Sequence, residues 1–480
     1  VRACGDGALS GWQASPVIAE HWHPADSAGR VECDLCPRHC RPRDGQHGFC
    51  RVRGNVDGRL HTLNYGKSVA PTEEVIETEA VYQYSPGHRI LTLGNIGCMM
   101  ACDFCQNWQT SQVRHLDSDV VKSYTPNEVV EICEDHDLGM ISWTYNDPVV
   151  WHEFVLDTSR LARKKGLRTL YKSALYIEEA PARELIDCID VFSISLKSMS
   201  EDFSRKITKG ELGPVLERIK MIHRSGRHLE ISQLVIPERN DGLGDIRQTV
   251  QWVLDNLGDQ VPLHFVGFHP AYRYTDVERT SVECLLQARD EALRAGIKHC
   301  YLGNVYQEGV SDTHCSQCGH TLVTRYGLTA SVVGIAPGGT CSRCGQSTPI
   351  RFPFGAQPAA AGRPQQAAAT SHSANFRWTG DVNSVHLTLA RQPGDGPIEP
   401  LTVMVQHVGT PRVQHFRIGD GLERVIVSKG DDRDREILIT WDGDREVRVF
   451  PVLDRAHFPI EPEELLLEET RPLLSTPMIV

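Results

Sequence analysis

Three cysteines within eight residues constrain this chain most. Cys98, Cys102 and Cys105 are spaced Cx3CxxC, and Phe104 lies inside the last gap. Iron–sulfur cubanes are ordinarily held by four cysteines, and the next cysteine, Cys133, is too distant to belong to the same loop. Three thiolates can hold three irons of a cubane and leave the fourth iron open to another ligand. The alternatives are three buried core cysteines or a zinc site, although zinc prefers paired CxxC knuckles that total four ligands.

The segments around this triad alternate between strand and helix. Residues 91–97 form a short apolar run that ends in a glycine turn, and further strands are expected at 138–145, 167–173, 190–196, 228–236, 262–268 and 298–303. Helices are expected from the capping box Thr125-Pro-Asn-Glu128 onward and at 149–165, 214–225, 245–257 and 280–295. Repeated strand–helix units predict a parallel sheet with covering helices. We therefore expect an α/β fold, a partial barrel of (β/α)6 type, with the triad at the carboxyl ends of its strands.

Eight further cysteines fall into two other sets. They are Cys33, Cys36, Cys40 and Cys50 near the N-terminus, and Cys315, Cys318, Cys341 and Cys344. The later set consists of two CxxC pairs separated by 22 residues, the pattern of a zinc ribbon, with a rubredoxin-like iron site as the alternative. For the N-terminal set zinc and a second cubane both fit. Zinc is slightly favoured there, because Pro37 and the charged loop after it resemble a structural site.

Composition sets limits on partners and location. The net charge of −12 argues against a nucleic-acid partner, because phosphate binding needs a surplus of Lys and Arg. The chain has no apolar run of about 18 residues, the length that would span a membrane, and residues 1–7 lack the apolar core of a signal peptide. Clustered CxxC pairs in such a chain indicate metal ligation rather than disulfides. We therefore expect a cytoplasmic protein.

The chain is expected to divide into five segments. Residues 1–85 form a Cys-rich N-terminal region, 86–306 the partial barrel and 307–352 the zinc-ribbon-like module. A linker at 353–375 is rich in Ala, Pro and Gln, so it cannot bury a core. From 376 to 480, period-two runs such as Val385-His-Leu-Thr-Leu and Leu401-Thr-Val-Met-Val predict a small all-β accessory domain of β-sandwich type.

Several motifs occur in a specific order from Cys33 to about Cys344. They are Cys33-Asp-Leu-Cys36-Pro-Arg-His-Cys40, the triad with Gln106-Asn-Trp108, Trp143-Thr-Tyr-Asn-Asp-Pro148, Val235-Ile-Pro, His264-Phe, Phe268-His-Pro270 and Gly303-Asn304. In this order they resemble the radical S-adenosylmethionine (SAM) superfamily. The resemblance is to the radical SAM component of AmmeMemoRadiSam systems and to pyruvate-formate-lyase-activating enzymes.

The resemblance implies a cofactor and its ligands. A [4Fe–4S] cluster on the triad would bind SAM at its open iron, and one electron from a flavodoxin- or ferredoxin-type reductant would cleave SAM to a 5′-deoxyadenosyl radical that removes a carbon-bound hydrogen. The implied SAM-site residues are Phe104 behind the adenine, Asn107 on the cluster loop, Asp147 at the ammonium, Lys197 at the carboxylate, and Ser173, Ser195 and His264 near them. The alternatives are that Asp147 only caps the following helix, that Lys197 is solvated, and that His264 is a core histidine.

The chain departs from the family at some of these positions, which affects the expected substrate. Ser195 stands where the family usually has aspartate, and Asp147 where it has glutamate. We therefore predict a different small-molecule substrate, for example a carbohydrate that is epimerised in antibiotic biosynthesis. Epimerisation needs a hydrogen donor on the opposite face, and the candidate cysteines are Cys133, Cys188, Cys284 and Cys300. Cys300, on the last strand, is the catalytic candidate if it points into the barrel, although a buried thiol is more often inert. His269, near the mouth of the strand at 262–268, is the other catalytic candidate, since it could reach SAM or substrate. The other hypotheses are an activating enzyme that places a glycyl radical on a partner protein and a non-enzymatic iron–sulfur electron carrier.

Overall fold

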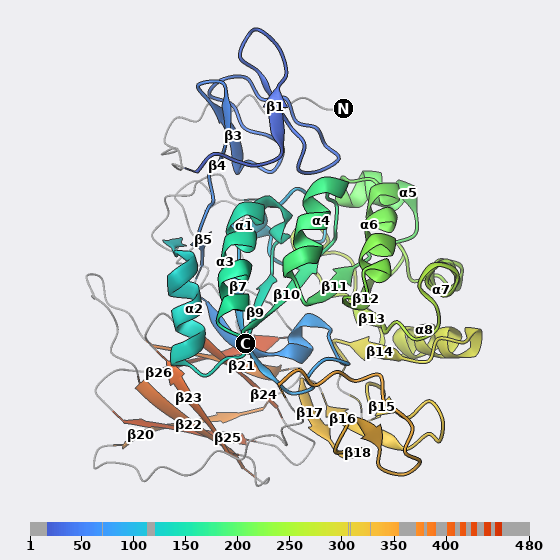
Figure 1. The fold of residues 1–480 in the computed structure, drawn as a ribbon. Coiled ribbons are helices and arrows are strands. Elements are labelled where there is room, and N and C mark those ends of the chain that lie inside the picture. Colours follow the sequence, from blue (N-terminus) through green and yellow to red (C-terminus); the bar gives the residue numbers. More distant parts are fainter. Residues whose placement is uncertain are drawn as a thin grey trace.

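A curved sheet forms the centre of the computed structural model, which describes residues 17–69, 71–112, 121–305, 307, 309–326, 328–354, 371–378, 382–389, 401–408, 413–418, 424–429, 436–442 and 447–453. The parallel strands of this sheet lie side by side in chain order (Figure 1). They are β7 (Arg89–Gly94), β9 (Met140–Thr144), β10 (Arg168–Ser173), β11 (Val191–Ser195), β12 (His228–Val235), β13 (Leu263–Gly267) and β14 (Cys300–Gly303). Because β14 lies at the end of the strand order, the barrel is open. The predicted α/β partial barrel is confirmed.

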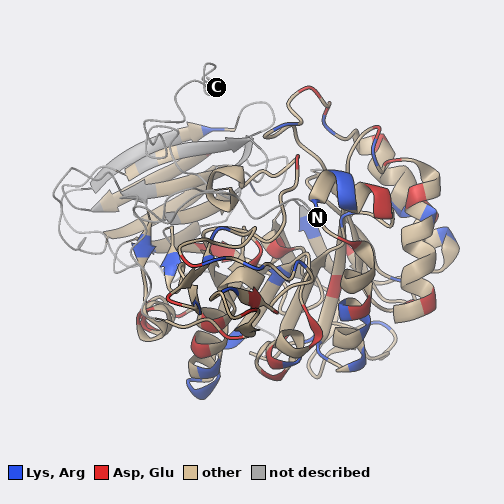
Figure 2. Ribbon diagram, turned by 90° about the horizontal axis from the view of Figure 1, so that it is seen from above, with Lys and Arg blue, Asp and Glu red and all other residues tan. Residues whose placement is uncertain are grey.

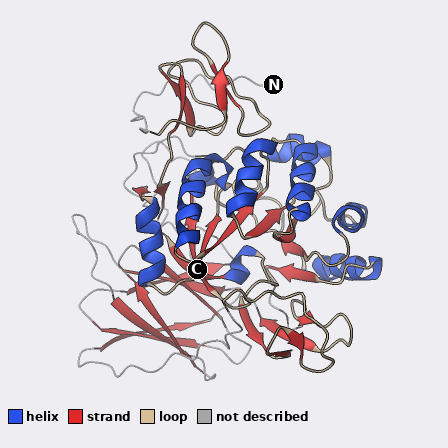
Figure 3. Cartoon of the chain, in the orientation of Figure 1, coloured by secondary structure: helices blue, strands red, loops and turns tan. Residues whose placement is uncertain are grey.

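Helices cover the outer face of this sheet (Figure 3). They are α2 (Pro126–Asp135), α3 (His152–Lys164), α4 (Glu179–Cys188), α6 (Leu212–Arg224), α7 (Leu243–Leu257) and α8 (Val282–Ala295). The capping box at the start of α2 is formed as expected, since the Thr125 side chain accepts from the Glu128 backbone N–H and Glu128 bonds back. Helix α4 was not predicted, and its Pro181 lies in the first turn, where proline is tolerated.

A short segment continues the sheet beyond β7, on the side away from β9. It consists of β6 (Thr72–Val75), which pairs with β7 in antiparallel fashion, and the 3-10 turn η1 (Ile76–Glu79). Its four glutamates, Glu73, Glu74, Glu77 and Glu79, are all buried. Buried carboxylates need hydrogen-bond or charge partners, so this segment brings fixed polar groups into the barrel.

The N-terminal lobe lies over one end of the barrel (Figure 1). It contains two small antiparallel pairs, β1 (Trp22–Pro24) with β2 (Val31–Cys33) and β3 (Arg53–Val56) with β4 (Arg59–Thr62), and is followed by β5 (Lys67–Ser68), which pairs with β8 (Lys122–Ser123). A buried ion pair ties the lobe to α3, because Arg53 Nη1 lies 2.9 Å from Glu153 Oε1. The lobe is therefore anchored to the helical layer rather than only tethered to it.

The residues after β14 form small β-structures. The cysteine module contains β15 (Thr313–His314), β16 (Thr321–Tyr326), β17 (Thr329–Val332), β18 (Ile335–Ala336) and β19 (Thr340–Cys341). Residues 355–370 of the predicted linker, and residues 454–480 of the predicted accessory domain, lie outside the described chain.

Two antiparallel sheets follow and share one apolar core. One contains β20 (Ser371–Arg377), β25 (Glu436–Asp442), β22 (Leu401–Val408) and β23 (Val413–Ile418). The other contains β24 (Arg424–Ser428), β21 (Val382–Leu389) and β26 (Val447–Leu453), and it continues the barrel sheet because β24 pairs in parallel with β6. This pairing was not predicted, since it joins residues about 350 positions apart in the sequence.

Charges of both signs are interspersed over the helices (Figure 2). None of the helices in the described residues is long and apolar enough to cross a membrane.

Candidate functional site

The triad loop leaves the carboxyl end of β7 and ends at the short helix α1 (Trp108–Ser111). Gly97 begins the loop with φ +89°, and a Cβ there would lie 2.7 Å from a methyl group of Val52 and 3.0 Å from the Cys50 carbonyl oxygen. A side chain would meet both this backbone strain and this contact. The glycine therefore lets the loop pass directly against the N-terminal lobe.

The three cysteines of the loop are partly exposed, and their thiols lie in surroundings that shift their pKa values. Burial raises the pKa of Cys98 well above its ordinary value, and it raises the pKa of Cys102 to about 12 although the Lys197 cation opposes this. Met100 N donates to Cys98 Sγ at 3.4 Å, and the Ser111 hydroxyl lies 3.4 Å from Cys105 Sγ. Such thiols lose their protons when they bind metal, so metal ligation fits this environment.

Asp103 holds the middle of the triad loop in place. Its backbone N–H donates to the Ile207 carbonyl at 3.1 Å, within the π-helical turn η3 (Ser204–Thr208) that continues α5 (Glu201–Phe203). Its carboxylate pairs with Lys209 Nζ at 2.9 Å and with Arg273 Nη1 at 3.1 Å. Sequence reasoning missed this clamp, because its parts come from segments more than 100 residues away.

A large cavity opens beside the triad. Its empty space, including its opening to solvent, is about 1160 Å³. Residues from the carboxyl ends of successive barrel strands line it, among them Thr144, Ser173, Ser195, Ser232 and Val266. Ligands of parallel α/β sheets bind at this end of the strands. The cavity therefore joins the candidate cluster site to the barrel interior.

Asp147 lies in this cavity, directly after β9. It caps the turn η2 (Pro148–Trp151), since its Oδ1 accepts from Val149 N at 3.2 Å. It also accepts from the Ser173 hydroxyl at 2.8 Å and from Ala174 N at 2.7 Å. Burial raises the pKa of Asp147, and these hydrogen bonds act against that rise. Asp147 therefore caps η2 and also lines the cavity.

Phe104 and Asn107 occupy the cavity wall formed by the triad loop. Phe104 is 4% exposed and packs near the rings of Phe203 and Tyr274, with centroid separations of 6.1 and 6.2 Å. The Asn107 amide donates to the Tyr145 carbonyl at 3.0 Å. Asn107 therefore links the triad loop to the residues that follow β9.

Ser195, the last residue of β11, and Lys197, two residues later, also line the cavity. The amide of Asn240 donates to the Lys197 carbonyl at 2.8 Å, which fixes the backbone there. The Lys197 cation is close enough to act on the pKa of both Cys102 and Asp147. Lys197 thus supplies a positive charge near the triad thiols and the Asp147 carboxylate.

His264, His269 and Cys300 do not line the cavity. His264 is fully buried, its Nε2 lies 2.7 Å from Glu230 Oε2, and burial lowers its pKa. Cys300 lies near Arg289 and Asp290 of α8, and burial raises its pKa to about 12. Since the register pairs Tyr301 with His264 on the inner face, the adjacent Cys300 faces the helices. Cys300 therefore matches the stated alternative of a buried thiol, and its side chain lies toward α8 rather than the barrel interior.

Two inner residues that sequence reasoning missed shape the barrel end of the cavity. The carboxylate of Glu79 accepts from the hydroxyls of Ser142 and Thr144, each at 2.8 Å. Lys172 Nζ donates to the Glu79 carbonyl at 2.8 Å and to the Ser193 hydroxyl at 3.1 Å. For Glu79 the available signal is the cluster of four glutamates at 73–79. Lys172 has no such signal.

The other two cysteine sets also come together. Cys315, Cys318, Cys341 and Cys344 place their sulfurs within 4.8 Å of one another. Cys33, Cys36, Cys40 and Cys50 line a second cavity in the N-terminal lobe. Both arrangements bring four thiols together, as the sequence predicted, and both could hold metal.

A family model and several known proteins match parts of this chain. Residues 95–253 match the model of the Radical SAM superfamily. An uncharacterized protein of Methanocaldococcus jannaschii is 36% identical over 322 residues, which cover 67% of this chain and 96% of that protein. The (2S)-3-sulfopropanediol dehydratase activating enzyme of Klebsiella oxytoca is 22% identical over 236 residues, or 47% of this chain and 71% of that enzyme. A domain of pyruvate-formate lyase-activating enzyme from Bacteroides vulgatus aligns with 34% of this chain and 99% of its own, at 16% identity and a TM-score of 0.31.

Proposed function

Because this chain belongs to the radical SAM superfamily, we propose that it is an enzyme that removes a carbon-bound hydrogen from a polyhydroxylated small molecule. A [4Fe–4S] cluster on the triad, with SAM bound, supplies one-electron cleavage of SAM to methionine and a 5′-deoxyadenosyl radical. The donor set fits such a cluster, since Cys98, Cys102 and Cys105 face one cavity from a single loop. The electron would come from a flavodoxin- or ferredoxin-type reductant.

The cavity residues fit the parts of SAM. The Asp147 carboxylate would accept from the SAM ammonium, and the Lys197 ammonium would meet its carboxylate. Phe104 would pack against the adenine, while Asn107, Ser173 and Ser195 would hold the surrounding walls in place. A carboxylate and a lysine about a common cavity match the two opposite charges of an amino acid group.

The single observation that supports the substrate class is the polar barrel end of this cavity. Glu79, Thr144 and Lys172 line it, and their mutual hydrogen bonds hold them in position. Fixed carboxylate, hydroxyl and ammonium groups on a cavity wall recognise the hydroxyl groups of a ligand well, because they offer both hydrogen-bond donors and acceptors in set positions. The substrate class is therefore a carbohydrate or a similar polyol.

Epimerisation of a sugar carbon in secondary metabolism is the finer form of this proposal. It requires a hydrogen donor on the opposite face of the sugar. The chain's non-ligand cysteines within the described residues, Cys133, Cys188, Cys284 and Cys300, all lie away from the cavity lining. The geometry therefore supports hydrogen abstraction more strongly than hydrogen return from a cysteine of this chain.

The test is anaerobic reconstitution with iron and sulfide, followed by dithionite, SAM and candidate sugars labelled with deuterium. We expect deuterium in the 5′-deoxyadenosine formed from one of them. Lys172→Met should raise the KM for that sugar about tenfold or more, since it removes hydrogen bonds from a charged donor. Lys164→Met, on the exposed side of α3, is the matched control and should leave KM unchanged. Absence of 5′-deoxyadenosine would contradict the radical chemistry, and unlabelled product with every sugar would contradict the substrate class.

A second candidate is an activating enzyme that forms a glycyl radical on a partner protein. The similarity to the Klebsiella oxytoca activating enzyme over 236 residues favours it. It predicts a glycyl radical signal in electron paramagnetic resonance (EPR) when a partner protein is added, with no sugar needed.

The remaining segments are proposed to serve this enzyme. Cys315, Cys318, Cys341 and Cys344 would hold one zinc ion in a ribbon-like module, with rubredoxin-like iron as the alternative that metal analysis separates. The two sheets β20–β26 would form a sandwich-type accessory domain that holds the carbohydrate. The proposed boundaries are 1–85, 86–306, 307–352, 353–375 and 376–480.

A further inference from the structure

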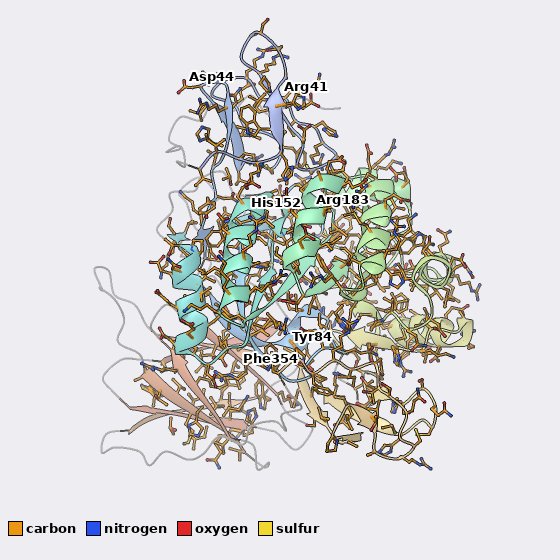
Figure 4. The ribbon with its side chains drawn as sticks, in the orientation of Figure 1. Arg41, Asp44, Tyr84, His152, Arg183 and Phe354 are labelled. Atoms are coloured by element: carbon orange, nitrogen blue, oxygen red, sulfur yellow. The ribbon has the colours of Figure 1, made fainter. Side chains whose placement is uncertain are left out.

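The N-terminal cysteine set encloses a cavity of its own. Cys33, Cys36, Cys40 and Cys50 line it, and Met99 of the triad loop and Val150 of η2 close it on the barrel side. The space between them, including its opening to solvent, is about 370 Å³. Figure 4 labels Arg41 and Asp44 in the outer part of the lobe and His152 on α3 below it. The four thiols thus border one shared space.

The distances between sulfur atoms can be compared among the three cysteine sets of the chain. In the Cys315 set, Sγ–Sγ distances of 3.6 and 3.7 Å occur, and a tetrahedral zinc ion with Zn–S bonds of about 2.3 Å holds its sulfurs about 3.8 Å apart. The triad of this radical SAM chain has a wider arrangement, because its sulfurs are not all within 4.8 Å of one another. Across the described residues, no three of the N-terminal thiols meet that distance either. Among the described residues, the close spacing of a single-ion site therefore occurs at the Cys315 set, and neither the triad nor the N-terminal thiols have it.

The surroundings suit thiolates bound to a cluster. Phe49 N donates to Cys40 Sγ at 3.4 Å. Arg53, which is 1% exposed, lines the cavity and brings a buried positive charge to it. Hydrogen bonds and positive charge near the sulfurs stabilise an anionic iron–sulfur cluster and set its potential.

We propose that Cys33, Cys36, Cys40 and Cys50 hold a second [4Fe–4S] cluster, which lies beside the SAM-binding cluster. This replaces zinc, which the sequence slightly favoured for these residues. With four cysteine ligands it has no iron open to SAM, so it adds no second site of SAM cleavage.

Direct contacts join the two cluster sites. Arg38 Nε donates to the Met99 carbonyl at 2.7 Å, and Arg38 also bonds the Lys209 carbonyl. The Cys50 carbonyl lies against Gly97, one residue before Cys98. Arg38 and Gly97 therefore keep the two cysteine loops in contact.

The test removes the triad and leaves the N-terminal lobe intact. In the triple variant C98A/C102A/C105A, we expect about four iron and four sulfide ions per chain after reconstitution. We also expect about one zinc ion, at the Cys315 set. The EPR signal of the reduced variant should not change when SAM is added. Cys284→Ala, a thiol outside all three sets, is the control and should keep the metal content of the wild type.

The converse variant is C36A/C40A, which should lose about four iron ions and keep an EPR signal that changes with SAM. If C36A/C40A does not fold, the metal content of the triple variant still shows whether the N-terminal cysteines bind a cluster. Zinc in place of iron at the N-terminal set in the triple variant would overturn the proposal, and so would a lobe that binds neither metal. Because these readouts need no turnover, failure of the proposed sugar chemistry would leave them unaffected.

Discussion

Asp147→Asn tests whether this carboxylate binds SAM or only caps η2. Two carboxylate oxygens offer about four acceptor sites, and Val149, Ser173 and Ala174 use three of them. One site therefore stays available for the SAM ammonium. The loss of a hydrogen bond to a charged group costs about 1.5–3 kcal/mol, which corresponds to a SAM Kd about 10- to 150-fold weaker.

The assay is SAM binding to the reconstituted protein under anaerobic conditions, followed by EPR or equilibrium dialysis. Thr125→Ala is the matched control, because it removes the helix cap of α2, which lies outside the cavity. Both variants should lower the melting midpoint, while Thr125→Ala should leave the SAM Kd unchanged. Wild-type SAM affinity in Asp147→Asn would refute the reasoning and leave Asp147 as a helix cap.

Three further outcomes are expected. Cys318→Ser should lose about one zinc ion per chain without loss of iron, and the cysteine module should become sensitive to protease; unchanged zinc in metal analysis would contradict this. Burial raises the pKa of Glu74 to about 7, so the folded state holds a proton that the unfolded state releases, and stability should fall as pH rises from about 4.5 to 7. Glu74→Gln should flatten that part of the curve of melting midpoint against pH, whereas exposed Glu131→Gln should not. Glu153→Gln leaves Arg53 buried without its charge partner, so it should destabilise the N-terminal lobe by about 3–5 kcal/mol, as measured by hydrogen exchange. Glu134→Gln, which breaks an exposed ion pair, is the control and should cost less than about 1 kcal/mol.

Local patterns were sufficient for the elements of the barrel. The strand expected at 167–173 is β10 (Arg168–Ser173), and the helix expected at 245–257 is α7 (Leu243–Leu257). Hydrophobic periodicity and capping residues act within a few positions of the chain, so the sequence shows them directly. Helix α4 escaped because Pro181 reads as a break in the sequence, although it lies in the first turn of the helix.

The face on which a strand residue lies was harder to predict. Alternation along β14 places the side chains of Cys300 and Tyr301 on opposite sides of the sheet, but it does not say which of these residues points toward the barrel interior. Pairing of Tyr301 with His264 on β13 decides this, and it turns Cys300 toward α8. Because neighbouring residues of a strand face opposite sides of the sheet, the Cys300 thiol lies on the helix side and not in the cavity.

The sequence by itself determined the radical SAM triad, the other two cysteine sets and the order of strands and helices, because ligand spacing and periodicity are properties of neighbouring residues. Only the tertiary structure decided what surrounds them. The clamp on Asp103, the polar cavity end at Glu79 and Lys172, and the contact of Cys50 with Gly97 each join segments far apart in the chain. Such contacts arise from packing and from the need to pair buried polar groups, which no local pattern records.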